Sequence, residues 1–306
     1  MGRLVLLAAA LGVLLAGCTS SNQPDPTTAA NSSSPVSTGA AASTPTKSAW
    51  PTATHTSTQP KSAPVSTGPG SRAPSPPPVA FPPVSVPPGS GPLIMLNPGH
   101  NGANGSHPEI NRPVPSDHYG GTRACDTTGT NTNAGYPEHA FNWDVTMRVR
   151  ALLQARGVRV GLTRPDDVGV GPCIDQRSAI GNQPGVVAFI SIHADGAGAD
   201  GHGFHICEDS RPPAGPDVAA RSHRLTVALH DALVTGSGLT TSTYLGSDGY
   251  FPRSDLAGLN LADVPATFIE LGNMRNAGDA ALQSSPAGRA RVASAVAAGI
   301  LAFLGR

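Results

Sequence analysis

Two short apolar runs, each followed by a histidine, place the strongest constraint on the fold. Leu93–Leu96 lies between prolines, and His100 follows after the turn-forming pair Pro98-Gly99. Val186–Ile192 is apolar over almost its whole length, and His193 comes directly after it. Short apolar runs bounded in this way predict strands that are buried on both faces. Both strands should therefore belong to a sheet that helices cover on its two sides.

The rest of the folded region alternates between predicted strands and predicted helices. Strands are expected at Leu93–Asn97, Val158–Thr163, Val186–Ile192, Gly203–Cys207 and Ala266–Leu271. Helices are expected at Glu138–Arg156, Cys173–Asn182, Pro216–Thr235 and Pro286–Leu304. This alternation favours an α/β fold, with one domain, a mostly parallel central sheet and helices on both faces.

The first residues of the chain have the pattern of a lipoprotein signal peptide. Residues 1–17 combine a basic start with an apolar run that is too short to cross a bilayer, as in secretory signals. The run ends in Leu15-Ala16-Gly17-Cys18, which resembles the bacterial lipobox. The resemblance implies cleavage before Cys18, lipidation of its thiol, export, and anchoring to the outer face of the cell membrane. The alternative is ordinary signal cleavage that leaves an incidental cysteine.

Residues 18–91 predict a disordered tether, because Ser, Thr, Pro, Ala and Gly dominate and apolar residues show no period. Residues 92–306 remain as one folded domain, which is long enough to bury a core of its own. The formal net charge is zero, so composition gives no support for a nucleic-acid partner. The sequence shows no internal repeat or separate binding module, and we expect a monomer.

Three residues are expected to meet at one edge of the predicted sheet. His100 and His193 follow predicted parallel strands, and sites form beyond the carboxyl ends of such strands. Glu138 follows Pro137 at the start of a helix, and the start of a crossover helix faces the same edge. Two imidazoles and a carboxylate form a ligand set that leaves a catalytic zinc ion one open position. Taken singly, each residue also has a structural explanation, as a histidine in a surface turn or a glutamate that favours the helix dipole.

Glu270 ends a further predicted strand that begins at Ala266. A buried strand rarely ends in an acid unless that acid has a partner. Near a zinc-bound water, Glu270 could act as the general base and then as the acid for the leaving nitrogen. The alternative is a salt bridge to an arginine such as Arg253 or Arg275.

Four segments of the chain occur together in the order of a family signature. They are Asn97-Pro98-Gly99-His100, Pro137-Glu138, Ser191-Ile192-His193-Ala194-Asp195 and Glu270-Leu271-Gly272-Asn273-Met274-Arg275-Asn276. As a set they resemble the zinc-dependent N-acetylmuramoyl-L-alanine amidases, which are bacterial cell-wall hydrolases with a single α/β catalytic domain. The long loop from Asn101 to Pro137 most resembles a small single-domain actinobacterial-type branch.

The resemblance implies that His100, Glu138 and His193 bind zinc and that Glu270 is the catalytic carboxylate. It also implies a substrate, peptidoglycan, and a reaction in which a zinc-activated water cleaves the amide bond between N-acetylmuramic acid and L-alanine of the stem peptide. Asn97 departs from the family, because many members carry Asp there, and we expect the change to affect local support and not coordination.

Two other functions stay open at this point. A zinc peptidase that cuts bonds within the stem peptide would use the same ligands. A non-catalytic lipoprotein that binds peptidoglycan is the second, and the acidic side chain of Glu270 argues against it.

Four further histidines are not expected to bind the metal ion. His202 and His205 lie three residues apart around a predicted strand, so their side chains should point to opposite faces and not share a metal ion. His223 and His230 lie seven residues apart on a predicted helix, and both are interpreted as surface residues.

Three cysteines remain once Cys18 is lipidated, which is an odd number for an oxidising compartment. Cys125 lies in the loop after the first strand, and Cys173 lies in the loop after Val158–Thr163. Both loops should leave the same edge of the sheet, so we predict a disulfide between Cys125 and Cys173. Cys207 then remains as a buried thiol.

Overall fold

The computed structural model describes residues 88–306. The predicted signal peptide at residues 1–17, the lipidation site Cys18 and nearly all of the predicted tether at residues 18–91 lie outside the described residues. These three assignments therefore stay predictions.

The described residues are built on a six-stranded sheet. Its strands are β1 (Leu93–Pro98), β4 (Arg159–Leu162), β5 (Val186–Asp195), β6 (His205–Asp209), β7 (Tyr250–Arg253) and β8 (Ala266–Asn273). Their order across the sheet is β4-β1-β5-β8-β6-β7. β4, β1, β5 and β8 are parallel to one another, whereas β6 runs antiparallel to β8 and parallel to β7. The mostly parallel sheet predicted from the sequence is confirmed, with two reversed strands at one side.

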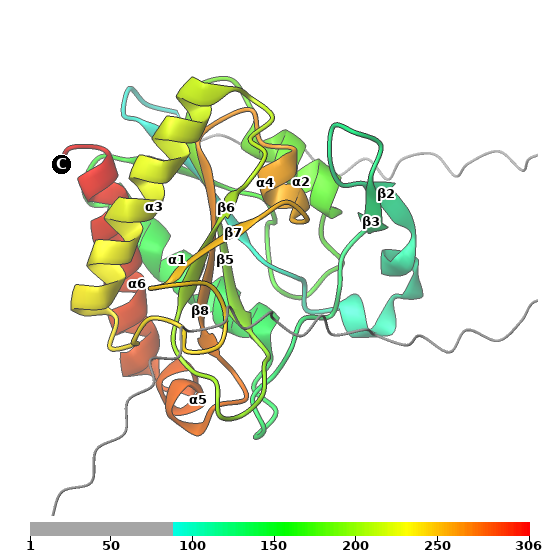
Figure 1. Ribbon diagram of the computed structural model, residues 1–306, viewed down its shortest axis with the longest axis vertical. Coiled ribbons are helices and arrows are strands. Elements are labelled where there is room, and N and C mark those ends of the chain that lie inside the picture. The colour runs from blue at the N-terminus through cyan, green and yellow to red at the C-terminus, as the bar shows by residue number, and fades with distance from the viewer. Residues whose placement is uncertain (1–87) are drawn as a thin grey trace, which may run out of the picture. The chain divides into compact units, whose positions relative to one another are not determined.

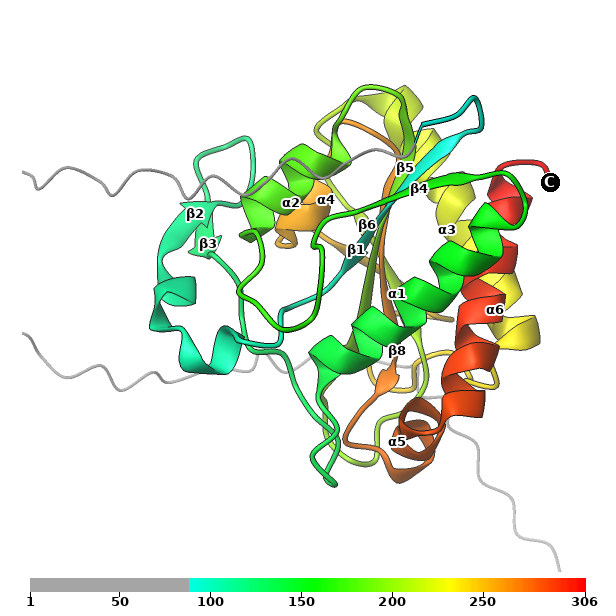
Figure 2. The same ribbon diagram turned by 180° about the vertical axis from the view of Figure 1, so that it is seen from behind.

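Helices cover both faces of this sheet (Figures 1 and 2). One face carries α1 (Glu138–Gln154), α3 (Pro216–Gly236) and α6 (Pro286–Phe303), and the other carries α2 (Ile174–Gly181) and α4 (Ala257–Asn260). The larger core lies under α1, α3 and α6 and includes Phe141 and Leu229. The smaller core lies under α2 and α4 and includes Phe189 and Leu259. Within residues 88–306, no helix combines the length and the apolar character needed to cross a membrane.

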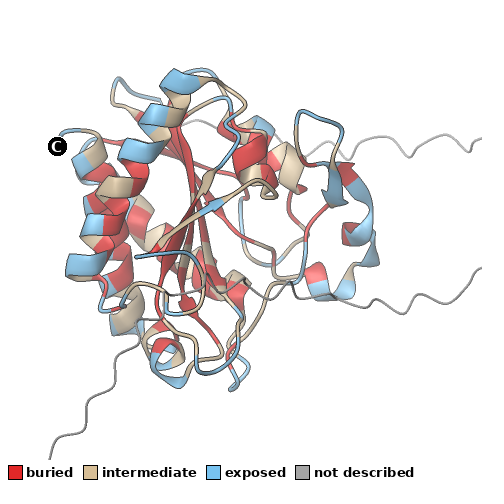
Figure 3. Ribbon diagram, viewed as in Figure 1, coloured by how far each residue is buried: buried red, intermediate tan, exposed pale blue. Residues whose placement is uncertain are grey.

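The two cores explain why the first strand has no polar residue in its apolar run. Successive side chains of a strand point to opposite faces of the sheet. Ile94 and Leu96 enter the larger core, and Leu93 and Met95 enter the smaller one, so all four are at most 1% exposed. Figure 3 shows the same burial through the centre of the sheet.

Several short elements have no counterpart among the predicted ones. They are β7, α4, α5 (Ala277–Ser284), the antiparallel strands β2 (Pro113–Pro115) and β3 (Thr122–Ala124), and two 3-10 turns at Asn104–Ser106 and Pro108–Asn111. β7 lies at the edge of the sheet, contains an exposed proline and shows no alternation of apolar and polar residues. α5 begins where the side chain of Asn276 accepts hydrogen bonds from two backbone N–H groups. β6 also begins and ends two residues later than predicted.

The three cysteines of the described domain are arranged as the sequence predicts. Cys125 and Cys173 form a disulfide, and Cys207 is a buried free thiol. The loops that carry Cys125 and Cys173 follow β1 and β4, which are parallel neighbours in the sheet. Their meeting therefore follows from the direction of these strands.

One prediction about the outlying histidines is wrong. His223 is exposed on α3, but His230 on the same helix is only 8% exposed. The ring of His230 stacks on Tyr250 at a centroid distance of 4.5 Å, and its Nε2 lies 2.9 Å from Asp248 O. The chain that leads into β7 covers this turn of α3, and the helical spacing alone could not show that.

Candidate active site

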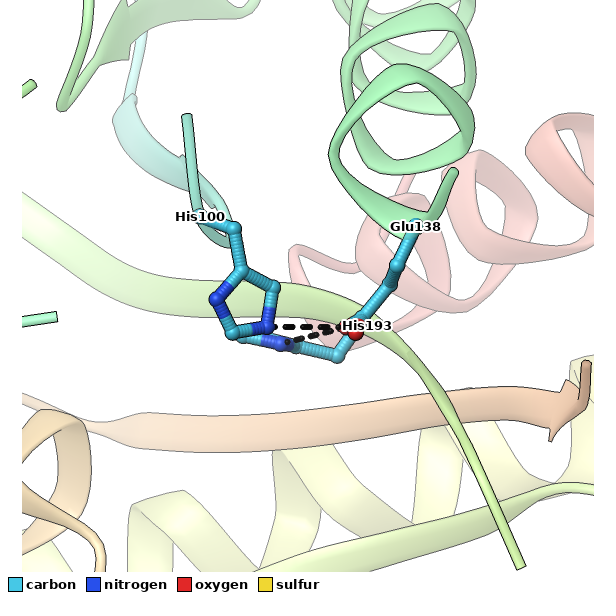
Figure 4. Close-up of side chains that lie close together, drawn as sticks. All are labelled: His100, Glu138 and His193. Carbon is cyan, nitrogen blue, oxygen red and sulfur yellow. Dashed lines mark hydrogen bonds and ion pairs between the residues drawn. The ribbon is translucent and has the colours of Figure 1, made fainter. Parts of the chain in front are cut away.

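The ends of three elements bring His100, Glu138 and His193 together (Figure 4). His100 follows β1, Glu138 is the first residue of α1, and His193 lies near the end of β5. His100 Nε2 lies 3.1 Å from Glu138 Oε1, and His193 Nδ1 lies 3.0 Å from the same oxygen. One potential ligand atom from each residue lies within 4.8 Å of the other two. The three residues thus meet at the sheet edge where they were expected from the sequence.

Parallel pairing between β1 and β5 explains why the two histidines meet. Pro98 pairs with Ile192, and Gly99 N donates a hydrogen bond to Ile192 O at 3.0 Å. A Cβ atom at position 99 would lie 2.0 Å from Cε1 of His193, so glycine is required beside this ring. His100 itself has a φ of 59°, a conformation that residues other than glycine rarely adopt. The turn that presents His100 therefore depends on its surroundings.

Glu138 is 4% exposed, and N–H groups hold its carboxylate in place. Its Oε2 accepts a hydrogen bond from Thr130 N at 2.9 Å, and Asn142 Nδ2 donates to its Oε1 at 3.3 Å. Burial alone would raise the pKa of Glu138. The neighbouring imidazoles of His100 and His193 outweigh burial and hold the pKa well below its usual value. Glu138 therefore keeps the negative charge that a metal ligand needs.

The ring of His100 is oriented by contacts on the side away from Glu138. Its Nδ1 lies 3.0 Å from Thr127 O and 3.3 Å from Asp126 Oδ1, which leaves Nε2 facing the cluster. Burial alone would lower the pKa of His100, but Glu138 and Asp126 outweigh burial and raise the pKa to about 10. A metal ion that binds Nε2 must therefore displace a proton.

The donor set of this cluster fits a zinc ion. Two imidazole nitrogens and one carboxylate oxygen occur together as the protein ligands of catalytic zinc sites, which keep a fourth position open. Burial lowers the pKa of His193, so its ring is neutral, as a metal-binding imidazole must be. The contact between Asp126 and the outer nitrogen of His100 is of the kind that commonly fixes a histidine ligand.

Glu270 lines the same cavity, which has a volume of about 650 Å³. β8 pairs it with His193 on β5, so the two side chains share a face of the sheet. Its Oε2 is buried and has no hydrogen-bond partner among residues 88–306. Burial, followed by the charges of Glu138 and Asp195, raises the pKa of Glu270 well above its usual value. A carboxyl group in this state can exchange a proton with a molecule in the cavity.

Among residues 88–306, no arginine forms a salt bridge with Glu270, which was the alternative explanation of this residue. Arg253 instead makes two hydrogen bonds to Asp255, at 2.8 Å and 2.7 Å. Arg275 contacts asparagine side chains of the long loop after β1. A larger groove of about 1010 Å³ between α3 and α6 contains neither Glu270 nor any residue of the His-Glu-His cluster.

Two buried arginines support the turn that carries His100, and neither was identified from the sequence. Arg177 donates to Pro98 O at 2.8 Å and to His100 O at 3.0 Å, and Arg164 donates to Pro98 O at 3.0 Å. Arg177 also donates to Asn97 Oδ1 at 3.0 Å, so Asn97 contributes to this support and lies outside the cluster of ligand atoms. No local pattern marks an arginine as buried, because burial of a charge depends on partners that are distant in the chain.

Three potential metal ligands and a carboxyl group that can exchange a proton open into one cavity of an α/β domain. This arrangement is typical of metal-dependent hydrolases. Comparison with known families then gives the particular one. The family model described as N-acetylmuramoyl-L-alanine amidase matches residues 94–302. The chain belongs to this family.

Mycobacterial relatives are similar over nearly all of the described domain. An N-acetylmuramoyl-L-alanine amidase of Mycobacterium tuberculosis is 45% identical over 215 residues, which cover 70% of this chain and 87% of the relative. The crystal structure of the amidase Ami1 from Mycobacterium smegmatis is 46% identical with a TM-score of 0.67, and covers 71% of this chain and 98% of that one. Apo Ami1 from Mycobacterium abscessus is 48% identical with a TM-score of 0.66, over 70% of this chain and 99% of that one.

Proposed function

We propose that the protein hydrolyses the amide bond between N-acetylmuramic acid and L-alanine in the stem of peptidoglycan, with zinc as its cofactor. The observation that carries the proposal is the convergence of His100, Glu138 and His193 beside Glu270 in one cavity. Membership of the amidase family and the names of the mycobacterial relatives support the choice of substrate.

Each of the four residues has a defined task in this reaction. His100, Glu138 and His193 would hold the zinc ion. Bound zinc lowers the pKa of a water molecule and polarises the carbonyl group of the substrate. Glu270 takes the proton of the attacking water on a carboxylate oxygen and then donates it to the nitrogen of the departing alanine. Its Oε2 is available for this because no described residue competes for it by hydrogen bonding.

Replacement of the histidines tests the ligand assignment. His100→Ala and His193→Ala should each lose bound zinc and muramoyl-peptide hydrolysis together. His223→Ala removes an exposed imidazole on α3 and serves as the matched control, which should still bind zinc. A variant at His100 or His193 that binds zinc with unchanged affinity would remove that residue from the ligand set.

We also propose that the protein works outside the cytoplasmic membrane as a lipid-anchored monomer. The support is the lipobox-like sequence that ends at Cys18 and the low-complexity composition of the segment that follows it. A tether of this composition would let the domain reach the cell wall while the lipid keeps it at the membrane.

A further inference from the structure

The disulfide joins the two segments that support His100. Cys125 directly precedes Asp126, and Cys173 is the N-cap of α2, one helical turn before Arg177. Next to the disulfide, Ile174 N donates a hydrogen bond to Cys125 O at 2.8 Å. The crosslink therefore holds the start of α2 against the loop that carries Asp126.

Asp126 links His100 to Arg177. Its Oδ1 lies 3.3 Å from His100 Nδ1, and its Oδ2 accepts a hydrogen bond from Arg177 Nη2 at 3.2 Å. The same Nη2 donates to the backbone oxygen of His100 at 3.0 Å. Asp126 is 7% exposed and Arg177 is 3% exposed, so water cannot readily replace either partner. Loss of one partner leaves the other as an uncompensated buried charge.

The second histidine of the cluster has no equivalent support. Among residues 88–306, Glu138 is the only carboxylate that pairs with the ring of His193. That ring instead stacks on Phe268 at a centroid distance of 4.2 Å. The orientation of His100 thus depends on a polar network, whereas the orientation of His193 depends on packing. Contacts to the outer nitrogen of a histidine ligand set both its direction and its basicity.

We propose that Asp126 is a positioning residue for His100 and that the Cys125–Cys173 disulfide keeps Asp126 in place, so that the redox state of the disulfide controls metal affinity. This inference rests on the proposed role of the cluster as a zinc site. A dithiol breaks the S–S bond by giving each sulfur one electron and one proton, and the dithiol closes to its own cyclic disulfide. After reduction only non-covalent contacts hold the Asp126 loop to α2. Asp126 and Thr127, the two residues that contact His100 Nδ1, are then held less firmly.

Zinc affinity of the oxidised and the reduced protein tests this directly. The protein is reduced with dithiothreitol, the reductant is removed without oxygen, and affinity is measured by competition with a chromophoric chelator. Reduction of the wild type should weaken zinc binding by about 10–100-fold, the usual effect of losing an outer contact to a ligand. Cys125→Ser combined with Cys173→Ser should give the same weakening without free thiols. The visible spectrum of bound cobalt(II) should change in parallel.

Asp126→Asn provides the decisive comparison. Oxidised Asp126→Asn should bind zinc about as weakly as the reduced wild type, and its reduction should change affinity by less than about threefold, because the contact is already lost. Asp144→Asn is the control. Among residues 88–306, Asp144 forms ion pairs with Arg148 and Arg289, and neither arginine bonds to the turn that carries His100. The full effect of reduction should persist in Asp144→Asn.

Two outcomes would overturn the inference. One is unchanged zinc affinity and an unchanged cobalt spectrum when the wild type is reduced. The other is an equal effect of reduction in the wild type and in Asp126→Asn. If Asp126→Asn does not fold, the Cys125→Ser and Cys173→Ser double variant decides, and wild-type affinity in it counts against the inference. Tight zinc binding in both redox states would leave the proposed function intact, whereas an oxidised protein that binds no zinc would reject the proposed function itself.

Discussion

Acid should destabilise the folded domain through one buried histidine, His205. Its side chain is 1% exposed, packs against the rings of Tyr244 and Phe251, and has an Nδ1 without a hydrogen-bond partner among the described residues. Burial, partly opposed by Asp195, lowers the pKa of His205 from 6.5 to about 4. The unfolded chain therefore binds a proton at this residue before the folded domain does. The stability that the neutral ring contributes is complete above pH 6.5 and is lost as the pH falls through about 4.

The size of this loss follows from the pKa shift. One pKa unit is worth about 1.4 kcal/mol, so the shift of His205 corresponds to about 3 kcal/mol of unfolding free energy. The free energy of unfolding is measured with urea at several values between about pH 7 and pH 4. It should fall by this amount more in the wild type than in His205→Asn, because the variant has no imidazole ring to titrate. Other groups that titrate in this pH range do so in both proteins, so their effects cancel when the two unfolding free energies are subtracted. The exposed-site control His223→Asn should follow the wild type, and parallel pH curves for the wild type and His205→Asn would refute the reasoning.

Three further predictions concern single residues. Glu270→Gln should keep zinc affinity but lose about 10²–10⁴-fold in turnover, because only the proton-carrying group is removed, and a rate near that of the wild type would assign the proton to another group. Cys207 should resist a thiol reagent in the native protein and react after unfolding in urea, because burial raises the pKa of its thiol. Labelling at the rate of an unfolded thiol would contradict that burial. The Cys18→Ser variant should be absent from the membrane fraction or should fail to be processed. A mature wild-type protein with a lipid-free N-terminus at another residue would rule out lipidation.

Features governed by local pattern and by strand direction could be predicted from the sequence. The apolar runs that begin at Leu93 and Val186 became central strands because both faces of the sheet are covered. The rule that parallel strands end at one edge then brought His100 beside His193, and Cys125 beside Cys173. Glu138 joined the site because the start of a crossover helix faces the same edge.

Features that depend on distant partners could not be predicted in this way. Burial of His230 results from the chain near Asp248, which approaches α3 only in the folded domain. In the sequence, nothing distinguishes Arg177 from other residues of its helix, yet its side chain donates a hydrogen bond to the backbone oxygen of His100. Within residues 88–306, strand β7 pairs only with β6, at an edge where little burial is needed, so its sequence shows no alternation of apolar and polar residues.

Identification of the cleaved bond tests the central proposal most directly. A purified muramoyl-peptide is incubated with three forms of the protein: as isolated, after a chelator has removed zinc, and after zinc has been restored. The products are then identified by mass spectrometry. We expect a free stem peptide that begins with L-alanine, together with muramic acid that retains its lactyl carboxyl group. This product should disappear with the chelator and return with zinc. Shortened peptides still attached to muramic acid, or release that does not depend on zinc, would contradict the proposal.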